Sequence, residues 1–349
     1  MSFGSCLFKL PHYWAAWLAL GVYLQPAYSA SFDLPSDGST VVGQVRRVLP
    51  ENGNTLLDIG RHFDLGYAEM EQANPGTSVW TPQGPIVAPT QFILPPKPWT
   101  GIVVNIPQRR LFYFPTPVTG QAPKVITYPI SIAQVGWSTP LGATRIVAKY
   151  QDPAWFVPKS IQAQHSKEDG VAFPTYFPPG PDNPMGMLAL ETSLPGIFIH
   201  GTNHPWGVGL RASHGCMHLY PEDAANLFPL VKVGTAVRVI NAPVLIGNLA
   251  GYWVMSTFPL LNEYPNQPSL DNWVHQSLMT LTLAPDRIAM DRVAALIANP
   301  EPIPVELNIN QPSLAEKLDT IAVEPFAYAP YGADANAAQV PSEVLKGAQ

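Results

Sequence analysis

The sequence predicts a mainly β fold with a minor α component, on three observations. Proline occurs 40 times in 349 residues, about twice its usual ~5% share, and proline inside a helix removes a backbone donor and clashes with the preceding turn. Short runs of β-branched and aromatic residues, bounded by proline, glycine or glutamine, recur through residues 99–241, as is typical of strands. Within that span only Pro221 to Val231 has the apolar spacing of a helix.

Composition also restricts the class of protein. Hydrophobic residues make up 46% of the chain, which is enough for a sizeable core, whereas charged residues make up only 13%. The formal net charge is −6, so we expect no nucleic-acid partner, because nucleic-acid-binding proteins present a basic face. No apolar run of ~20 residues follows the N-terminal segment, so we expect no membrane span after it.

Residues 1–30 have the pattern of a secretory signal peptide. Lys9 supplies the positive n-region, Trp14 to Leu24 form the apolar stretch, and small residues follow. Cleavage after Ser29 would put Ala27 and Ser29 at the two positions that favour small residues, which fits better than cleavage one residue later. We therefore expect an exported, periplasmic protein, with an uncleaved anchor as the alternative.

Residues 31–98 are predicted to form a small βααβ domain. Its expected elements are a strand over Val45 to Leu49, helices over Leu56 to Phe63 and Tyr67 to Ala73, and a strand over Phe92 to Leu94. This order, with the text GNTLLDIGRHFDL, resembles the LysM module, which binds the glycan strands of peptidoglycan. The resemblance implies glycan binding, and a structural domain that has lost its ligand is the alternative.

A second domain is predicted over residues 99–241. Its expected strands are Ile102 to Ile106, Arg110 to Phe114, Val125 to Ile130, Arg145 to Lys149, Gly196 to His200 and Ala236 to Ile240. An extension over residues 242–300 follows, with strands between Val244 and Leu261 and a helix over Asp286 to Ala298. From 301 to 349 the charge is sparse and proline recurs, which predicts a largely flexible tail.

The segment from His200 to Leu219 holds four of the eight histidines, and removal of the signal peptide would leave Cys216 as the only cysteine. A lone cysteine in an exported protein is either a buried bystander or a reactive thiol. His214 and Gly215 directly precede it, and His200 ends an apolar run sixteen residues earlier. A nearby imidazolium or aligned backbone donors would lower the thiol pKa from ~8.5, and Gly215 permits a sharp turn that aims N–H groups at an oxyanion. The pattern indicates a Cys–His site for acyl transfer.

A metal site is the rival interpretation of the same segment. Its competent zinc ligands are His200, His204, His214, Cys216 and His218. Proline and three glycines disfavour a helix that would bring the first two together, and structural zinc sites generally use more cysteines. We therefore expect no metal, and a purely structural cluster of histidines is the third interpretation.

Several short sequence motifs resemble those of one enzyme family. HGTN, ASHGCMHLYPEDAANLF and VGTAVRVIN are similar to the signature of the L,D-transpeptidase catalytic domain, the YkuD family, and in particular its ErfK-like exported members. STPLGATRI and PPGPDNPMG occur in the same order as in that subgroup, and the resemblance covers roughly residues 40–250. It implies a β-sandwich-like catalytic domain and a cysteine enzyme that acts on peptidoglycan stem peptides with no metal or organic cofactor.

The resemblance also implies roles for single residues. Cys216 matches the nucleophile and His200 the general base, and the backbone carbonyl of Gly201 matches the group that orients the base. The segment that shapes the oxyanion hole matches His214, Gly215 and Cys216. Chemistry of this kind needs only that the base lie next to the thiol in space.

Two further positions are implied to bind substrate. Ser213 matches the first residue of the motif, and His218 stands where the family usually has arginine or, in some branches, asparagine. Histidine offers neither the permanent charge nor the planar fork of arginine at neutral pH. We therefore expect the chemistry to survive, and substrate handling or pH dependence to differ.

The implied reaction is attack of Cys216 on the carbonyl of the third stem residue, with loss of the terminal D-alanine and transfer of the acyl group to an amine. An amine from a second stem peptide would give a cross-link, and a lysine of a lipoprotein would attach that protein to the wall. Water as acceptor would make the enzyme an L,D-carboxypeptidase. A catalytically retired peptidoglycan-binding protein is the alternative from another class.

Overall fold

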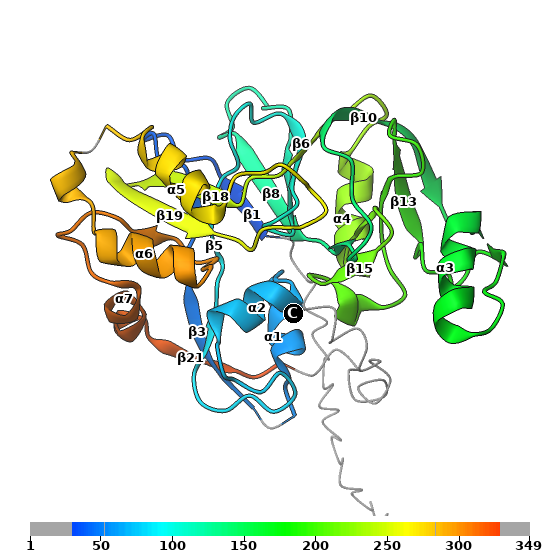
Figure 1. Cartoon of the computed structure of the whole chain (residues 1–349), viewed down its shortest axis with the longest axis horizontal. Coiled ribbons are helices and arrows are strands. Elements are labelled where there is room, and N and C mark those ends of the chain that lie inside the picture. The colour runs from blue at the N-terminus through cyan, green and yellow to red at the C-terminus, as the bar shows by residue number, and fades with distance from the viewer. Residues whose placement is uncertain (1–29, 52, 283, 329–349) are drawn as a thin grey trace, which may run out of the picture.

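The computed structural model describes residues 30–51, 53–282 and 284–328. The predicted signal peptide up to Ser29, and the part of the predicted tail after Tyr328, lie outside the described residues. In the part of the chain that the structure describes, no helix is both long enough and apolar enough to span a bilayer. Strands predominate and short helices lie between them (Figure 1), so the predicted mainly β class is confirmed.

A nine-stranded sheet forms the centre of the molecule. In order across the sheet, its strands are β1 (Ala30–Asp33), β8 (Lys124–Pro129), β7 (Arg110–Phe114), β6 (Gly101–Asn105), β17 (Ala236–Ile240), β10 (Gly142–Gln151), β13 (Leu188–Thr192), β14 (Phe198–His200) and β16 (Met217–His218). Neighbours are antiparallel except β6 with β17 and β14 with β16. All six strands predicted in residues 99–241 lie in this sheet, and β1 adds a strand from the start of the described chain.

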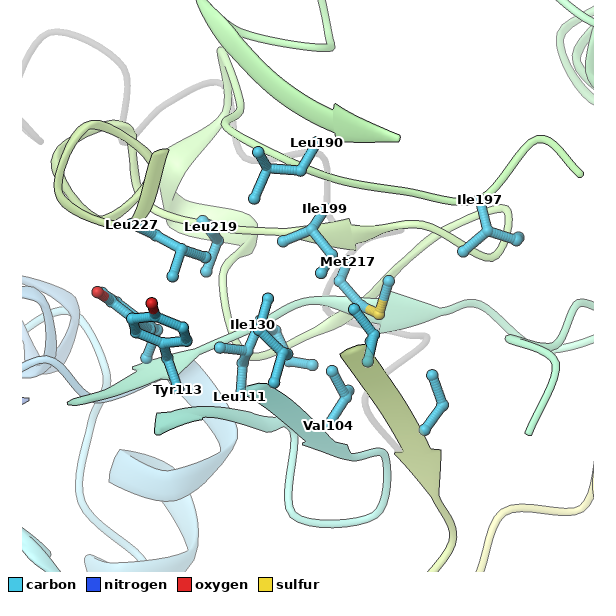
Figure 2. Packing of buried hydrophobic residues seen from close by; sticks show 14 of the residues in the cluster. Val104, Leu111, Tyr113, Ile130, Leu190, Ile197, Ile199, Met217, Leu219 and Leu227 are labelled. Carbon is cyan, nitrogen blue, oxygen red and sulfur yellow. The ribbon is translucent and has the colours of Figure 1, made fainter. Parts of the chain in front are cut away.

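Side chains alternate between the two faces of a strand. Both faces of the central strands are covered by a hydrophobic core. Val104 points into one core together with Met217 and with Leu227 of helix α4 (Pro221–Leu230), as Figure 2 shows. Val103 points to the opposite face and packs in a second core with Ile59 of the N-terminal unit. The central sheet and the N-terminal unit therefore share a core.

The N-terminal unit is a βααβ arrangement of β3 (Arg46–Pro50), α1 (Leu56–His62), α2 (Tyr67–Ala73) and β4 (Ile86–Ala88). Thr55 starts α1 with a capping box, in which its hydroxyl accepts the Asp58 N–H at 3.1 Å. The strand predicted over Phe92 to Leu94 is present as β5 (Gln91–Ile93), but it pairs with β2 (Val41–Gly43), and the strand that pairs with β3 is β4. Both runs are short and apolar, so their periodicity did not distinguish their partners.

An insertion between β10 and β13 contains β11 (Trp155–Phe156), α3 (Lys159–Asp169) and β12 (Tyr176–Phe177). This part projects at one end of the molecule (Figure 1). The sequence did not predict α3, because Ile161 is its one buried apolar side chain among those described and no apolar stripe exists to detect.

The C-terminal extension forms its own small sheet of β18 (Val244–Leu249), β19 (Tyr252–Thr257) and β20 (Val305–Glu306). Against it pack the unpredicted α5 (Leu270–Leu278) and the predicted helix α6 (Met290–Ala298), which follows the short η2 (Pro285–Arg287). The sheet meets β2 and β5 through a cluster that includes Val41, Ile93 and Leu245.

The predicted flexible tail is wrong for residues 301–328. After β20 the chain forms α7 (Leu314–Thr320) and β21 (Val323–Phe326), and β21 pairs in parallel with β3 of the N-terminal unit. Phe326 is buried in the core of that unit. The segment is polar and proline-rich in itself, and it is ordered by a partner almost 280 positions earlier in the chain.

Candidate active site

The parallel pair β14–β16 contains His200, and the predicted nucleophile Cys216 directly precedes β16. Ile199 lies opposite Met217 and His200 lies opposite His218. Ile199 and Met217 point into the core (Figure 2). Because side chains alternate, His200 and His218 lie on the other face, and so does Cys216, two residues before His218. The fold therefore brings the predicted nucleophile and base to one face of adjacent strands.

The sulfur of Cys216 is held by backbone groups. Its Sγ accepts the Phe198 N–H at 3.3 Å, and the thiol donates to the Gly196 carbonyl at 3.5 Å. Burial raises the pKa of the Cys216 thiol to about 11, and the Phe198 N–H opposes this only in part. The expectation of a lowered thiol pKa is wrong for this resting state, because desolvation of the anion outweighs a single donor.

His200 is held as a neutral base. Its side chain is buried, and its Nδ1 lies 2.6 Å from the Gly201 carbonyl oxygen. A carbonyl only accepts, so Nδ1 carries the proton and Nε2 is the basic nitrogen of the neutral ring. Burial lowers the pKa of His200 to about 4, against the opposing effect of the Gly201 and Met185 carbonyls. The resting pair is therefore thiol and imidazole, not thiolate and imidazolium.

The turn before Cys216 is fixed by two hydroxyl groups. Ser213, at the end of β15 (Arg211–Ser213), donates to the Cys216 carbonyl at 2.6 Å and accepts the Gly215 N–H at 3.1 Å. Thr139 donates to the Gly215 carbonyl at 2.8 Å. The backbone of β15 is in turn paired with β9 (Ile132–Ala133).

These contacts bear on two of the expected site roles. Ser213 is only 1% exposed, and its hydroxyl is engaged by the Cys216 carbonyl and the Gly215 N–H. The Gly215 N–H is used by Ser213, whereas the Cys216 N–H has no protein acceptor among the described residues. Gly215 itself has φ +125°, and a Cβ there would lie 3.2 Å from the Ser138 carbonyl oxygen, so the turn requires glycine.

His214 is occupied by structural contacts. Its Nε2 lies 3.0 Å from Gln134 Nε2, and the Trp137 ring stands edge-on at 4.7 Å. Trp137 donates to Gln164 of α3 at 2.6 Å, and His165 of the same helix lies 5.7 Å from the His214 ring. Burial, and secondarily His165, lower the pKa of His214 to about 4. The insertion that carries α3 therefore packs directly on the motif.

His218 lies beside the base. The ring centroids of His218 and His200 are 4.5 Å apart. Burial lowers the pKa of His218 well below its usual value, with smaller contributions from His200, His214 and His204. His218 is thus neutral at physiological pH and does not supply the positive charge that arginine would have there.

The loop over residues 178–186 lies against the base. The Asn183 side chain donates to the carbonyls of Pro153 at 2.7 Å and Pro178 at 3.0 Å. A Cβ on Gly186 would come within 2.9 Å of the Gly201 carbonyl carbon, so loop and base segment are in close backbone contact. Sequence reasoning missed Asn183, although an asparagine before proline is a turn signal.

The C-terminal extension also supports the motif, which no sequence signal indicated. Tyr264 donates to the Thr139 carbonyl at 2.8 Å, and Thr139 in turn donates to Gly215. Glu263 forms an ion pair with Arg211 of β15, and both side chains are largely buried. A chain of contacts therefore runs from the extension to the turn that presents Cys216.

The zinc interpretation finds no ligand set in the part of the chain that the structure describes. There, no group of three or more His, Cys, Asp or Glu side chains is arranged to hold a metal ion. His204 precedes the short η1 (Pro205–Gly207), while His200 and His218 share the strand pair.

Comparison with known proteins agrees with the geometry. The YkuD family model, described as the L,D-transpeptidase catalytic domain, matches residues 100–240. The chain is 34% identical over 312 residues to the probable L,D-transpeptidase YbiS of Escherichia coli K12, covering 86% of this chain and 99% of that protein. It is 39% identical over 219 residues to the probable L,D-transpeptidase ErfK/SrfK of Salmonella typhimurium LT2, covering 61% and 69%.

Solved structures resemble the chain over a smaller part. L,D-transpeptidase 3 of Mycobacterium tuberculosis aligns at 18% identity and a TM-score of 0.29, covering 46% of this chain and 73% of that one. The family assignment follows from the sequence relatives, of which YbiS is matched over nearly its whole length. The chain is a member of the YkuD family of L,D-transpeptidases.

Proposed function

We propose that this protein is an exported cysteine L,D-transpeptidase that acts in the periplasm on the tetrapeptide stems of peptidoglycan. Cys216 is the nucleophile and His200 the general base. The observation that carries the proposal is the His200 ring, fixed through Nδ1 to the Gly201 carbonyl, on the same face of the strand pair as the sulfur.

In the first step the Cys216 sulfur attacks the carbonyl of the third stem residue while His200 Nε2 takes the thiol proton. The bond to the terminal D-alanine then breaks, and the imidazolium returns the proton to the departing amine. The product is a thioester on Cys216. A thiol whose pKa is raised and an imidazole whose pKa is lowered favour proton transfer during attack over a preformed ion pair.

The developing oxyanion needs donors that are not already used. The Cys216 N–H is the candidate in the turn, because the Gly215 N–H is taken by Ser213. A backbone donor aimed at the oxyanion is worth ~2.7–4 kcal/mol of barrier in acyl-transfer enzymes. His214 contributes through its backbone position and its packing on Trp137 rather than through proton transfer.

In the second step an amine attacks the thioester and restores the thiol. A second stem peptide would give a cross-link, a lipoprotein lysine would give attachment to the wall, and water would give trimming. The N-terminal βααβ unit, with its LysM-like order, is proposed to hold the glycan strand. Its shared core with the catalytic sheet would keep glycan and active site in a fixed relation.

The test is incubation of the purified processed chain with a defined muropeptide dimer that bears tetrapeptide stems, followed by mass spectrometry. We expect an acyl-enzyme whose mass corresponds to the donor minus D-alanine, released D-alanine, and a product that identifies the acceptor. Cys216→Ala should abolish the acyl-enzyme, and His200→Gln should slow its formation by ~10²–10⁴-fold.

His275→Gln, at an exposed histidine of α5, is the matched control and should acylate at the normal rate. Absence of an acyl-enzyme and of any product with the unaltered chain would mean that the protein is a retired wall-binding protein. A product formed equally well by Cys216→Ala would refute the thioester route.

A further inference from the structure

Two carboxyl groups are buried together at the junction of the N-terminal unit and the catalytic domain. Asp64 follows α1 and is 5% exposed, and Asp223 lies in the first turn of α4 and is 2% exposed. Their side chains are hydrogen-bonded to one another. The Oδ2 atom of Asp223 has no hydrogen-bond partner among the described residues. A buried carboxyl oxygen without a partner is costly.

The nearby guanidinium groups are committed to other acids. Arg110 donates twice to Glu69, at 2.7 and 2.8 Å, and reaches only the backbone carbonyl of Asp64. Arg61 forms a two-bond pair with Glu222, at 2.6 and 2.8 Å. The two carboxyl groups therefore lack a cation of their own among these neighbours.

The backbone nitrogen of Ala30 lies where a cation would meet the two carboxyl groups. Ala30 begins β1, and its N–H donates to Asp64 Oδ2 at 2.5 Å. Ala30 also lines a cleft of about 620 Å³. The sequence predicts that the peptide bond before Ala30 is the one that signal-peptide removal hydrolyses.

We propose that processing between Ser29 and Ala30 creates an ammonium group that binds the buried Asp64–Asp223 pair. Hydrolysis of the peptide bond by water leaves a carboxylate on Ser29 and an amine on Ala30, which takes up a proton. The single N–H of the precursor thus becomes a charged group with three donors, opposite two carboxyl groups, one of which has an oxygen with no hydrogen-bond partner among the described residues.

This site would connect maturation to the active-site scaffold. Asp64 belongs to the N-terminal unit, and Asp223 lies five residues after His218 in the helix that follows the catalytic strand. Charge capture at Asp64 and Asp223 would therefore join β1, the end of α1 and the start of α4 in the processed chain alone.

The buried carboxyl pair makes the stability of the fold depend on pH. Burial raises the pKa of Asp64 to about 6 and raises that of Asp223 well above its usual value, with Glu222 opposing ionisation and Arg110 favouring it. Tyr220, buried beside them, donates to the Leu65 carbonyl. A carboxyl with a raised pKa stabilises the fold at low pH and loses that contribution as pH rises through about 6. An ammonium partner would remove the loss.

The experiment compares two forms of the chain over residues 30–349. One has a free Ala30 amine, made by cleaving a fusion directly before Ala30, and the other keeps a Gly-Ser extension. We expect their melting temperatures to agree near pH 5 and to diverge by at least ~2 °C at pH 7.5, with the free amine more stable. In the free form, the Ala30 amine should titrate at least one unit above its ordinary ~7.7–8.0.

Variants separate this site from a general effect of the extension. Asp64→Asn and Asp223→Asn should each abolish the difference between the two forms, and asparagine tolerates the φ of +61° at position 64. Asp33→Asn, on the same strand but in an exposed pair with Lys124, should leave the difference intact.

Three results would overturn the proposal. The first is export from cells of a chain whose N-terminus is Ser31 or later. The second is equal melting of the free and extended forms from pH 5 to 8. The third is a difference that persists in both asparagine variants, since it would then arise elsewhere.

Discussion

Replacing Ser213 with alanine tests whether the turn positions the nucleophile. The hydroxyl of Ser213 donates to the Cys216 carbonyl at 2.6 Å and accepts the Gly215 N–H at 3.1 Å. The variant leaves both backbone groups without this partner in a site where Ser213 is 1% exposed. We therefore expect a loss of ~2–4 kcal/mol in the free energy of unfolding, because a buried unpaired group costs ~1–3 kcal/mol.

The larger effect is expected on acylation. Displacement of a reacting group by ~1 Å costs about 10²-fold in rate, and Ser213 is the link that holds Gly215 and Cys216 in one turn. We expect acyl-enzyme formation, followed by mass spectrometry of the intact protein under single-turnover conditions, to slow by ~10–100-fold. Urea denaturation measures the stability change on the same preparations.

Ser256→Ala is the matched control. Ser256 is also buried and donates to the Pro302 carbonyl at 3.0 Å, but it lies in β19 of the C-terminal extension. It should lose ~1–2 kcal/mol of stability and acylate normally. If Ser213→Ala acylates at the rate of Ser256→Ala, the hydroxyl contributes stability only and the positioning role is refuted.

Three other predictions follow from the contacts described. Burial lowers the pKa of His200 from 6.5 to about 4, so kcat/KM should be level from pH ~5.5 to ~8 and fall below pH ~5. The free energy of unfolding should likewise decrease as pH falls from 6.5 toward 4. An inflection of kcat/KM near pH 6.5 would contradict this. Tyr264→Phe removes the 2.8 Å bond to the Thr139 carbonyl and should lower kcat several-fold with KM unchanged, so that a change in KM alone would disprove a role in positioning. Glu69→Gln leaves Arg110, which is fully buried, without its charge partner, and calorimetry should show a loss of ~3–5 kcal/mol; a loss under ~1 kcal/mol would show that the guanidinium finds another partner.

Local signals in the sequence were sufficient for six of the nine strands of the central sheet and for the four helices α1, α2, α4 and α6. Thr55 and Asp58 form the capping box that starts α1, and Pro221 starts α4 at a position where proline is favoured. Helix α3 was missed because it is polar nearly all round. The order of β21 was missed because its burial depends on β3, far away in the chain.

Some features of the candidate site could likewise be predicted from the sequence, and others could not. The short spacing of His214, Gly215 and Cys216 indicated a turn that presents a thiol, and the structure contains that turn. The sequence did not indicate that Ser213 occupies the Gly215 N–H, or that Tyr264 supports the turn through Thr139. Neither contact has a local periodicity, so neither has a signature in a single sequence.

By itself, then, the sequence determined which residue types lie together along the chain: the thiol, its glycine turn, the apolar strand that ends in His200, and the small residues before Ala30. Only the tertiary structure decided that β14 lies beside β16, that thiol and imidazole are both neutral at rest, and that Ala30 meets Asp64. The physical reason is the distance along the chain over which each interaction acts. Strand propensity and turn chemistry act between near neighbours, whereas pairing partners and the desolvation that shifts a pKa depend on groups brought together by the whole fold.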